Sequence, residues 1–270
     1  MNKNEHAMVD LLTIGKDKFG VVGVKAEFEA EGTRLDEVLR LLAVARAAGL
    51  PMTVKIGGCE AIRDLFEAKQ VGVAHIVAPM VESPYAVSKF IAAKNIVFNA
   101  EERRDTDFLF NLETILAYEH REALVEVAAA DDGVQGIVFG RVDFVGSMGR
   151  HRDDINDDDI TARVQTVAAL CRDHGLDFVV GGGVSSDALP AIRSVAETHL
   201  TRFETRKVIF SATEAHAPDL EDGLRNAVHF ELLWLLNKRD YYGRITHEDD
   251  KRIHMLESRW QVLNPDTATL

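Results

Sequence analysis

The sequence predicts a single (β/α)8 TIM barrel with an extra C-terminal helical segment, and three observations support this fold class. Short β-branched or apolar runs alternate with helical patterns from Phe19 to about Gly243, which is typical of βα units around a parallel sheet. The pattern gives eight strands, and this number favours a closed barrel over an open doubly wound sheet. The 270 residues, 46% of them apolar, suit one large core.

Each expected strand is a short run of apolar or β-branched residues. The eight runs are residues 21–29, 52–57, 75–80, 95–100, 108–113, 134–140, 177–183 and 203–210. The connection after the fourth run is too short for a full helix, so we expect this βα unit to be reduced. The eighth run, FETRKVIF, would place charged side chains on both faces of a buried strand, so we expect one pair to face the barrel mouth.

The expected helices carry apolar residues at i, i+3 and i+4. Leucines and alanines repeat in this way over residues 35–49, where Gly49 ends the helix, and Pro84 suits the first turn of another. The expected helices cover residues 35–49, 59–72, 83–94, 114–130, 160–175 and 185–197, and a long one begins at about Glu221. We expect the barrel to occupy residues 1–243 and a helical tail, residues 244–270, to pack on it or on a neighbouring subunit.

Composition and charge exclude several classes of function. A formal net charge of −13 argues against nucleic acid, because phosphate binding requires a clustered basic face. No run approaches the length of a membrane span, so we expect no membrane contact. Two cysteines, Cys59 and Cys171, fit a reducing compartment, and we expect the protein to be cytoplasmic.

Two carboxylates stand where strands of the predicted barrel end. Glu113 closes the fifth expected strand, and Asp143 lies just beyond the sixth among several glycines. Active sites of barrels lie at the carboxyl ends of the strands. Two carboxylates at that place suit a hard cation such as Mg²⁺ or Mn²⁺, which completes its coordination with water and substrate.

Three segments resemble one enzyme family. The segment GIVFGRVDFVGSMG at residues 136–149 resembles the glycine–x–x–aspartate–hydrophobic signature of the HpcH/HpaI aldolase and citrate-lyase β-subunit family. The segment NLET at residues 111–114 resembles the family's IET motif, and IVAPMVESPYAVSKFI at residues 76–91 resembles its VVPMVET segment. The motifs keep the family's order and spacing over most of the barrel.

The resemblance implies a metal-dependent carbon–carbon lyase or aldolase acting on a small 2-keto acid. Glu113 and Asp143 are then the ligands of a divalent metal, Mg²⁺ or Mn²⁺. Cleavage of a keto acid builds negative charge on the former keto oxygen, and a Lewis acid with a nearby cation stabilises that charge. The family has an arginine at the end of its second strand for this role, and here Lys55 stands in its place.

The first strand departs from the family pattern. Family members carry a glutamate–histidine pair there, whereas Glu29 is followed by Ala30. Alternation places Lys25, Glu27 and Glu29 on one face, which we expect to look into the barrel mouth. Either Glu27 or Glu29 could serve as acid–base, or both could simply pair with Lys25 and Lys55.

Further residues are candidates for substrate binding. Three glycines before a helix start can present bare amides to an anion, although a tight turn with serine capping explains them without a ligand. Arg206 could bind a substrate carboxylate, and Glu82 could contact a metal-bound water. The full set is Lys25, Glu82, Arg141, Gly182, Gly183, Ser185 and Arg206.

Two rival functions remain open at this point. In a Schiff-base aldolase Lys25, Lys55 or Lys207 would attack the substrate carbonyl. In a non-catalytic ligand-binding barrel the missing histidine and arginine would be explained, but the retained Glu113 and Asp143 would not.

The apolar segment around Trp234 and the exchange of C-terminal helices within the family predict a homo-oligomer, a trimer or hexamer.

Overall fold

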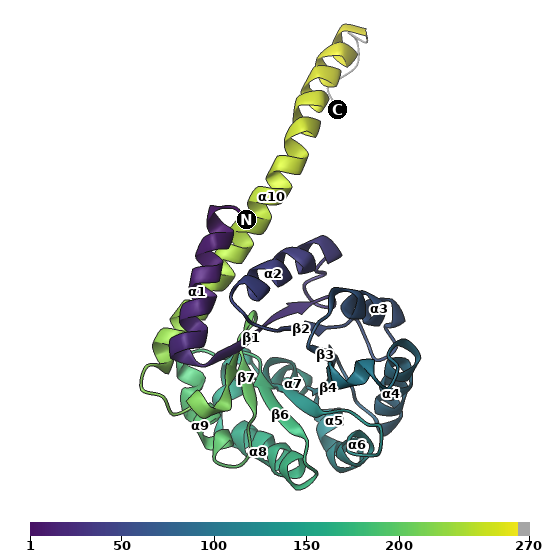
Figure 1. The fold of residues 1–270 in the computed structure, drawn as a ribbon, viewed down its shortest axis with the longest axis vertical. Helices are drawn as coiled ribbons and strands as arrows, with labels where there is room; N and C mark the ends of the chain where they lie inside the picture. Colours follow the sequence, from purple (N-terminus) through teal and green to yellow (C-terminus); the bar gives the residue numbers. More distant parts are fainter. Residues whose placement is uncertain (264–270) are drawn as a thin grey trace.

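Eight short strands close into one barrel in the computed structural model, which describes residues 1–263 (Figure 1). Seven neighbouring strands run parallel, and the eighth runs antiparallel to both of its neighbours. The strands are β1 (Val21–Glu27), β2 (Met52–Lys55), β3 (His75–Ala78), β4 (Asp107–Leu112), β5 (Gly136–Gly140), β6 (Asp177–Gly181), β7 (Arg202–Glu204) and β8 (Val208–Ser211). The prediction of a closed eight-stranded barrel with a long C-terminal helix is therefore confirmed.

Helices surround the barrel and extend it at both chain ends. The α-helices are α1 (Lys3–Phe19), α2 (Leu35–Ala47), α3 (Ile62–Val71), α4 (Pro84–Val97), α5 (Ile115–Glu119), α6 (Arg121–Ala128), α7 (Arg141–Ser147), α8 (Asp158–Asp173), α9 (Leu189–Ala196) and α10 (Leu220–Leu263). Short 3₁₀ helices are η1 (Glu102–Arg104), η2 (Arg152–Asn156), η3 (Ser186–Ala188) and η4 (Ala212–Glu214). The sequence patterns did not predict α1.

The expected fourth strand, residues 95–100, is wrong. Helix α4 continues to Val97, because Ala93 and Val97 extend its buried stripe at helical spacing and Phe98 packs edge-on against Phe108. Every later strand therefore moves down by one place in the order. Glu113 follows β4 rather than a fifth strand, and Asp143 follows β5.

The expected eighth strand, residues 203–210, is two strands joined by a tight turn. The N–H of Thr205 donates to the carbonyl of Val208 at 2.9 Å, and Thr205 Oγ1 accepts from the Val208 N–H at 3.1 Å. The turn explains the charges on both faces of that run, because Arg206 lies in the turn rather than in a strand. The barrel thus closes with the hairpin β7–β8 in place of a last βα unit.

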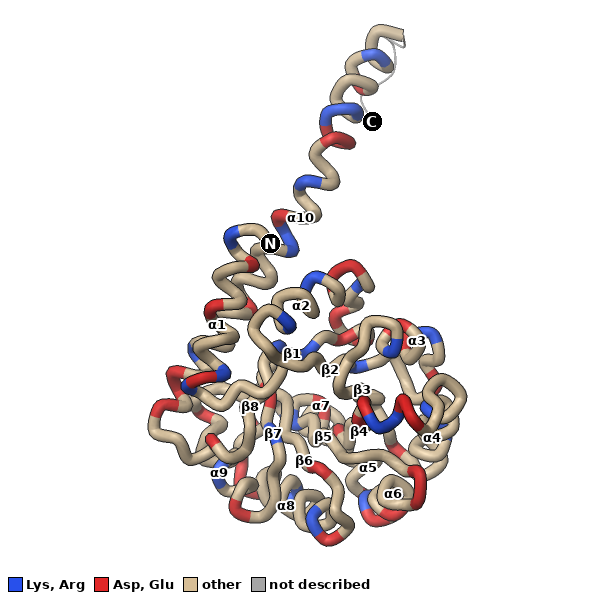
Figure 2. Tube along the Cα trace, in the orientation of Figure 1, with Lys and Arg blue, Asp and Glu red and all other residues tan. Residues whose placement is uncertain are grey.

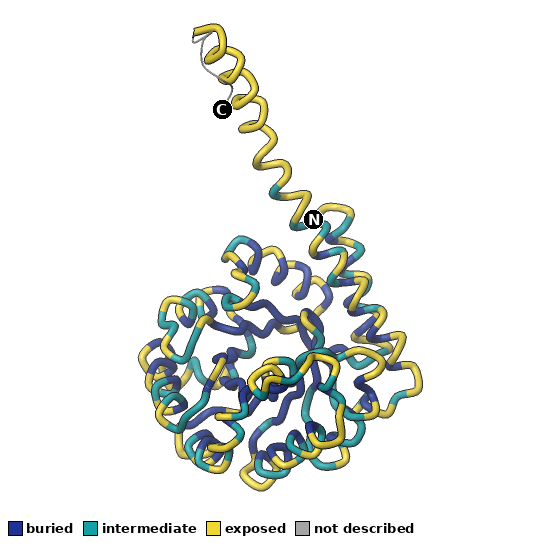
Figure 3. The backbone as a smooth tube through the Cα atoms, turned by 180° about the vertical axis from the view of Figure 1, so that it is seen from behind, coloured by how far each residue is buried: buried dark blue, intermediate teal, exposed yellow. Residues whose placement is uncertain are grey.

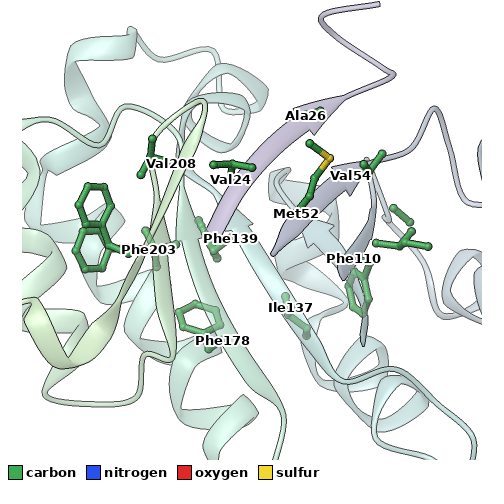
Figure 4. Close-up of a cluster of buried hydrophobic side chains, with 14 of the residues drawn as sticks. Val24, Ala26, Met52, Val54, Phe110, Ile137, Phe139, Phe178, Phe203 and Val208 are labelled. Atoms are coloured by element: carbon green, nitrogen blue, oxygen red, sulfur yellow. The ribbon is translucent and has the colours of Figure 1, made fainter. Parts of the chain in front are cut away.

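Alternation along the strands separates an apolar outer face from a small inner cluster. The outer face packs against the helices through large side chains such as Phe110, Phe139 and Phe178 (Figure 4). Inside the barrel, Val77, Leu109, Val138 and Val179 form a separate cluster of one residue from each of four strands. Buried charged side chains lie on other strands of the barrel, namely Lys25 and Glu27 on β1, Lys55 on β2 and Glu204 on β7, so the barrel opens onto a polar mouth.

Helix α10 runs without a break past the expected domain boundary at residue 243. Its first half packs beside α1, and its second half projects away from the barrel (Figure 1). Residues 243–263 are all exposed (Figure 3), so this part of the tail does not pack on its own barrel, and residues 264–270 lie outside the described residues. No helix among residues 1–263 is both long and apolar enough to cross a membrane.

Candidate active site

The carboxyl ends of the parallel strands meet at one end of the barrel, and buried charges gather there. Lys25 and Glu27 lie on β1, Lys55 ends β2, and Glu113 directly follows β4. Each of the four is at most 8% exposed. Because burying a charge is costly unless it is paired, a cluster of buried charges in a barrel mouth indicates a functional site more than a packing solution.

Glu113 is held by donors on both carboxylate oxygens. The Met80 N–H donates to Oε1 at 3.0 Å, and Asn111 Nδ2 donates to Oε2 at 2.5 Å. Met80 has a φ of 50°, a region uncommon for a residue with a side chain, so the loop after β3 is strained where it aims this amide. Gly140 leaves the space, since a Cβ there would lie 2.5 Å from Glu113 Oε2.

Asp143 stands close enough to Glu113 to affect its ionisation. Burial raises the pKa of Glu113. The positive charge of Lys55 and the two hydrogen bonds act in the opposite direction, and the negative charge of Asp143 raises the pKa further. Asp143 itself is exposed in the first turn of α7. A cation between the two carboxylates would relieve their repulsion.

The donor set fits a hard divalent cation. Carboxylate oxygens with the other positions left to water and substrate are what Mg²⁺ and Mn²⁺ prefer. Asn111 Oδ1 adds a buried acceptor that has no hydrogen-bond partner among the described residues. Within residues 1–263 no group of three or more His, Cys, Asp or Glu side chains could hold a metal, so a cation here would depend on Glu113 and Asp143.

Lys55 lies between two carboxylates at the end of β2. Its Nζ is 3.6 Å from Glu113 Oε2 and 3.2 Å from Glu29 Oε2. Burial lowers the pKa of Lys55, but the charges of Glu113 and Glu29 outweigh this and raise it above the ordinary value. Lys55 is therefore a fixed ammonium group beside the oxygen of Glu113. Glu29 Oε2 has no hydrogen-bond donor among the described residues, although it is in ion-pair range of Lys55.

Lys25 is tied to Glu27 on its own strand and to Glu204 on β7. The Nζ lies 2.5 Å from Glu204 Oε1 and 3.2 Å from Glu27 Oε1. The two carboxylates outweigh burial and raise the pKa of Lys25. Burial would raise the pKa of Glu27, but Lys25 and Lys55 together lower it. Glu204 belongs to the charged run 203–210, from which one pair was expected to face the mouth, but it was not among the predicted site residues.

A second missed group lies where the hairpin meets the loop after β1. Glu31 pairs with Lys207 and with Arg206, and Lys207 is only 2% exposed. From the sequence, Lys207 is a candidate Schiff-base lysine and one of the charged residues of the run 203–210. Because a register shift at the turn cannot be read from the sequence, nothing indicated that Lys207 points inward and Arg206 outward.

Glu82 and Asp143 border the mouth on the side of β3, β4 and β5. Glu82 Oε1 accepts from Thr114 Oγ1 at 2.7 Å. A pocket of about 460 Å³ is lined by Met80, Thr114, Val142, Asp143, Val145, Gly146, Ser147, Arg150 and Arg152. The pocket thus opens beside one of the two metal-ligand candidates.

The glycine turn after β6 contacts protein groups. Arg141 is 2% exposed, and its Nη2 donates to the carbonyls of Gly182 at 2.9 Å and Gly183 at 3.3 Å. Ser185 Oγ donates to Asp187, whose carboxylate lies at the helix start that was the candidate anion site. Burial lowers the pKa of Arg141 to about 10. In this structure Arg141 joins the Asp143 segment to the turn rather than facing the mouth.

Solved structures share this fold at low sequence identity. An HpcH/HpaI aldolase from Desulfitobacterium hafniense DCB-2 is 14% identical with a TM-score of 0.57, and the match covers 73% of this chain and 82% of that one. An HpcH/HpaI aldolase/citrate lyase family protein from Burkholderia cenocepacia J2315 is 14% identical with a TM-score of 0.58, covering 83% and 90%. A citrate synthase variant is 16% identical with a TM-score of 0.56, covering 87% and 90%. Comparison with curated proteins found no significant match.

The family model of the HpcH/HpaI aldolases and citrate lyases matches residues 30–198. This range includes Lys55, Glu113 and Asp143, whereas the hairpin β7–β8 and α10 lie beyond it. The chain therefore belongs to the HpcH/HpaI aldolase/citrate lyase family and is an enzyme of the aldolase or lyase type.

Proposed function

We propose that the protein is a metal-dependent carbon–carbon lyase acting on a small 2-keto acid. The observation that carries the proposal is the pairing of Glu113 and Asp143 beside the fixed ammonium of Lys55. Two carboxylates would hold the cation and a lysine would stand next to it. This arrangement suits an oxygen that gains negative charge during carbon–carbon cleavage.

Each mouth residue has a role in this proposal. A divalent metal, when bound, supplies the Lewis acid that polarises the keto group and stabilises enolate charge. Lys55 adds a second positive charge at the same oxygen. Asn111 and the Met80 amide hold the Glu113 carboxylate in place, so the site is preorganised before substrate arrives.

Glu29 is the better candidate for proton transfer. Glu27 is pinned by Lys25, and its lowered pKa makes it a weak base. Glu29 is 26% exposed at the side chain, lies in the loop after β1 and has an oxygen without a hydrogen-bond partner within residues 1–263. A carboxylate that is near the site and not fully engaged can take up a proton and return it.

The metal assignment can be tested by calorimetry with Mg²⁺ and Mn²⁺. We expect Glu113→Gln and Asp143→Asn each to abolish metal binding while the circular dichroism spectrum stays that of the wild type. Glu126→Gln, which changes an exposed carboxylate on α6 outside the mouth, is the control and should retain affinity. Unchanged affinity in both ligand variants would refute the metal site.

We also propose that a second copy of the chain covers α10, which gives a homo-oligomer, a trimer or hexamer. Lone helices are marginally stable in water, and the projecting half of α10 has no support from its own barrel. Apolar side chains that are 48–66% exposed follow the helix from the barrel outward, namely Val228, Leu232, Leu235, Tyr241, Ile245, Ile253 and Leu256. Charged residues of both signs occur along the same stretch (Figure 2), as they do on helices that pair with another helix.

A further inference from the structure

Arg141 is a buried arginine that bonds only to neutral oxygens. It is 2% exposed, its Nη1 donates to Asn156 Oδ1 at 2.9 Å, and its Nη2 donates to the carbonyls of Gly182 and Gly183 at 2.9 Å and 3.3 Å. Within residues 1–263 no carboxylate lies in ion-pair range of its guanidinium. A buried cation without a paired counter-charge costs free energy, so stability alone is a poor explanation for this side chain.

Asp143, two residues further along the chain, depends on the backbone for its position. Its side chain is exposed and makes no hydrogen bond or ion pair with any residue of the described range 1–263. It lies in the first turn of α7, which has seven residues and no side-chain cap at Gly140. Because so short a helix is not stable alone, contacts with the rest of the barrel must fix this turn.

Different contacts hold the two ends of α7. The later residues are held by Phe144, which packs edge-on against Tyr118, and by Ser147, whose Oγ accepts from the Ile115 N–H at 2.8 Å. At the start of the helix, the side-chain hydrogen bonds to another element come from Arg141. Arg141 is therefore the anchor nearest to the carboxylate of Asp143.

We propose that Arg141 is a positioning residue of the metal site, which holds the first turn of α7 so that Asp143 stays beside Glu113. The inference rests on the proposed metal site and assigns a role in it to a residue that touches neither metal nor substrate. An arginine suits this role because its two Nη atoms reach two different elements, the turn after β6 and the loop of η2.

The oxygens that accept from Arg141 belong to closely packed segments. A Cβ at Gly182 would lie 3.0 Å from the Arg141 backbone nitrogen, and a Cβ at Gly183 would collide with Ile155 Cδ1. Ile155 is buried and directly precedes Asn156, so the two elements that Arg141 joins also pack against each other. The guanidinium thus ties the start of α7 to a firm support.

Titration with Mn²⁺, followed by calorimetry and by electron paramagnetic resonance of the bound ion, tests the proposal. We expect Arg141→Met to lose Mn²⁺ affinity about 10–100-fold, the usual cost of removing a group that orients a metal ligand. The spectrum at saturating Mn²⁺ should also change, because Asp143 has moved. Arg141→Lys keeps the charge but reaches only one of the two elements, so it should recover only part of the affinity.

Lys94→Met is the matched control. Lys94 is a second buried cation that donates to two backbone carbonyls, those of Asp132 and Gly133 at 2.6 Å each, but it lies near the end of α4 at the loop before β5. Its replacement should lower the free energy of unfolding and leave both the Mn²⁺ affinity and the spectrum as in the wild type.

A double-mutant cycle tests whether the effect runs through the contact of Arg141 with Asn156. Asn156→Ala should lower Mn²⁺ affinity less than Arg141→Met does, and it should cost nothing further in the Arg141→Met background. If Arg141→Met does not fold, the half-buried Asn156 provides the decisive variant, and unchanged affinity and spectrum in Asn156→Ala would then overturn the proposal.

Two further results would overturn the positioning role. One is an Arg141→Met protein with wild-type Mn²⁺ affinity and spectrum, and the other is an equal loss of affinity in Lys94→Met, which would reduce the effect to general destabilisation.

Failure of the proposed function would look different. A wild type that binds no Mn²⁺, or binding that survives Glu113→Gln, would refute the metal site itself. Hydrogen exchange would then still decide whether Arg141 holds α7, since Arg141→Met should speed the exchange of residues 141–147 and Lys94→Met should not.

Discussion

Acidification should destabilise the barrel through one histidine at the end opposite the mouth. His75 begins β3, where its Nε2 accepts from Arg202 Nη1 at 2.7 Å and its Nδ1 lies 3.2 Å from Thr53 Oγ1. Because arginine can only donate, Nε2 must be unprotonated and the ring neutral. Burial first, and the charge of Arg202 second, lower the pKa of His75 to about 4.

The sign and size of the effect follow from this lowered pKa. The unfolded chain takes up a proton on His75 near its ordinary pKa of 6.5, whereas the folded chain resists it down to about 4. Stability from this residue is therefore complete above about pH 6.5 and is lost as the pH falls toward 4. A shift of this size corresponds to about 3.5 kcal/mol at ~1.4 kcal/mol per pKa unit. Asp107, whose pKa is raised by burial, opposes part of the loss because its protonation favours the folded state.

The assay is urea unfolding of the wild type and His75→Gln at about pH 7.5 and at ~pH 4.5, followed by circular dichroism. The variant lacks the titrating group. When the pH is lowered from about 7.5 to about 4.5, its free energy of unfolding should therefore fall by about 2.5 kcal/mol less than that of the wild type. A constant difference between the two proteins at both pH values would refute the reasoning. So would an NMR titration that places the pKa of folded His75 near 6.5.

Three further predictions concern the site and the assembly. Gly140→Ala should reduce metal affinity at least tenfold, since its Cβ would displace Glu113, whereas Gly146→Ala, with open space around its Cβ, should not; equal affinity in both variants would contradict the packing argument. Lys55→Arg should keep much of the wild-type kcat/KM on a keto acid, whereas Lys55→Met should lose about 10²–10³-fold, the cost of one preorganised donor. Equal and complete loss of activity in both variants, together with wild-type activity that survives removal of metal by a chelator, would favour an imine mechanism. Light scattering at micromolar concentration should give a species well above 29.9 kDa, and Ile253→Asp on α10 should lower its mass; a clean monomer would refute assembly through α10.

The ends of the strands were predictable because local pattern and chemistry agree there. Glu113 and Asp143 follow apolar runs that could only be buried strands, and parallel strands place their carboxyl ends together. The order of the strands was less predictable. Residues 95–97 read equally as a strand or as the end of a helix, and packing of α4 against β4 decided for the helix.

The partners of each charge could not be predicted from the sequence. Lys25 meets Glu204, and Lys207 meets Glu31, across more than 170 positions of chain in each pair. Such pairs depend on the closure of the barrel and on the two-residue turn of the hairpin, which shifts every side chain after it. The same holds for Asn111 and the Met80 amide, since only the folded loops bring them to Glu113.

By itself the sequence determined the barrel, the family resemblance and the place of Glu113 and Asp143 at the strand ends, because apolar periodicity and strand-end chemistry are local properties. Only the tertiary structure decided that β8 is antiparallel, that Lys207 is buried against Glu31, and that His75 is neutral beside Arg202. These features depend on which strands become neighbours when the barrel closes. Burial then fixes the charge states, because a buried ionisable group takes the state that its nearest partners stabilise.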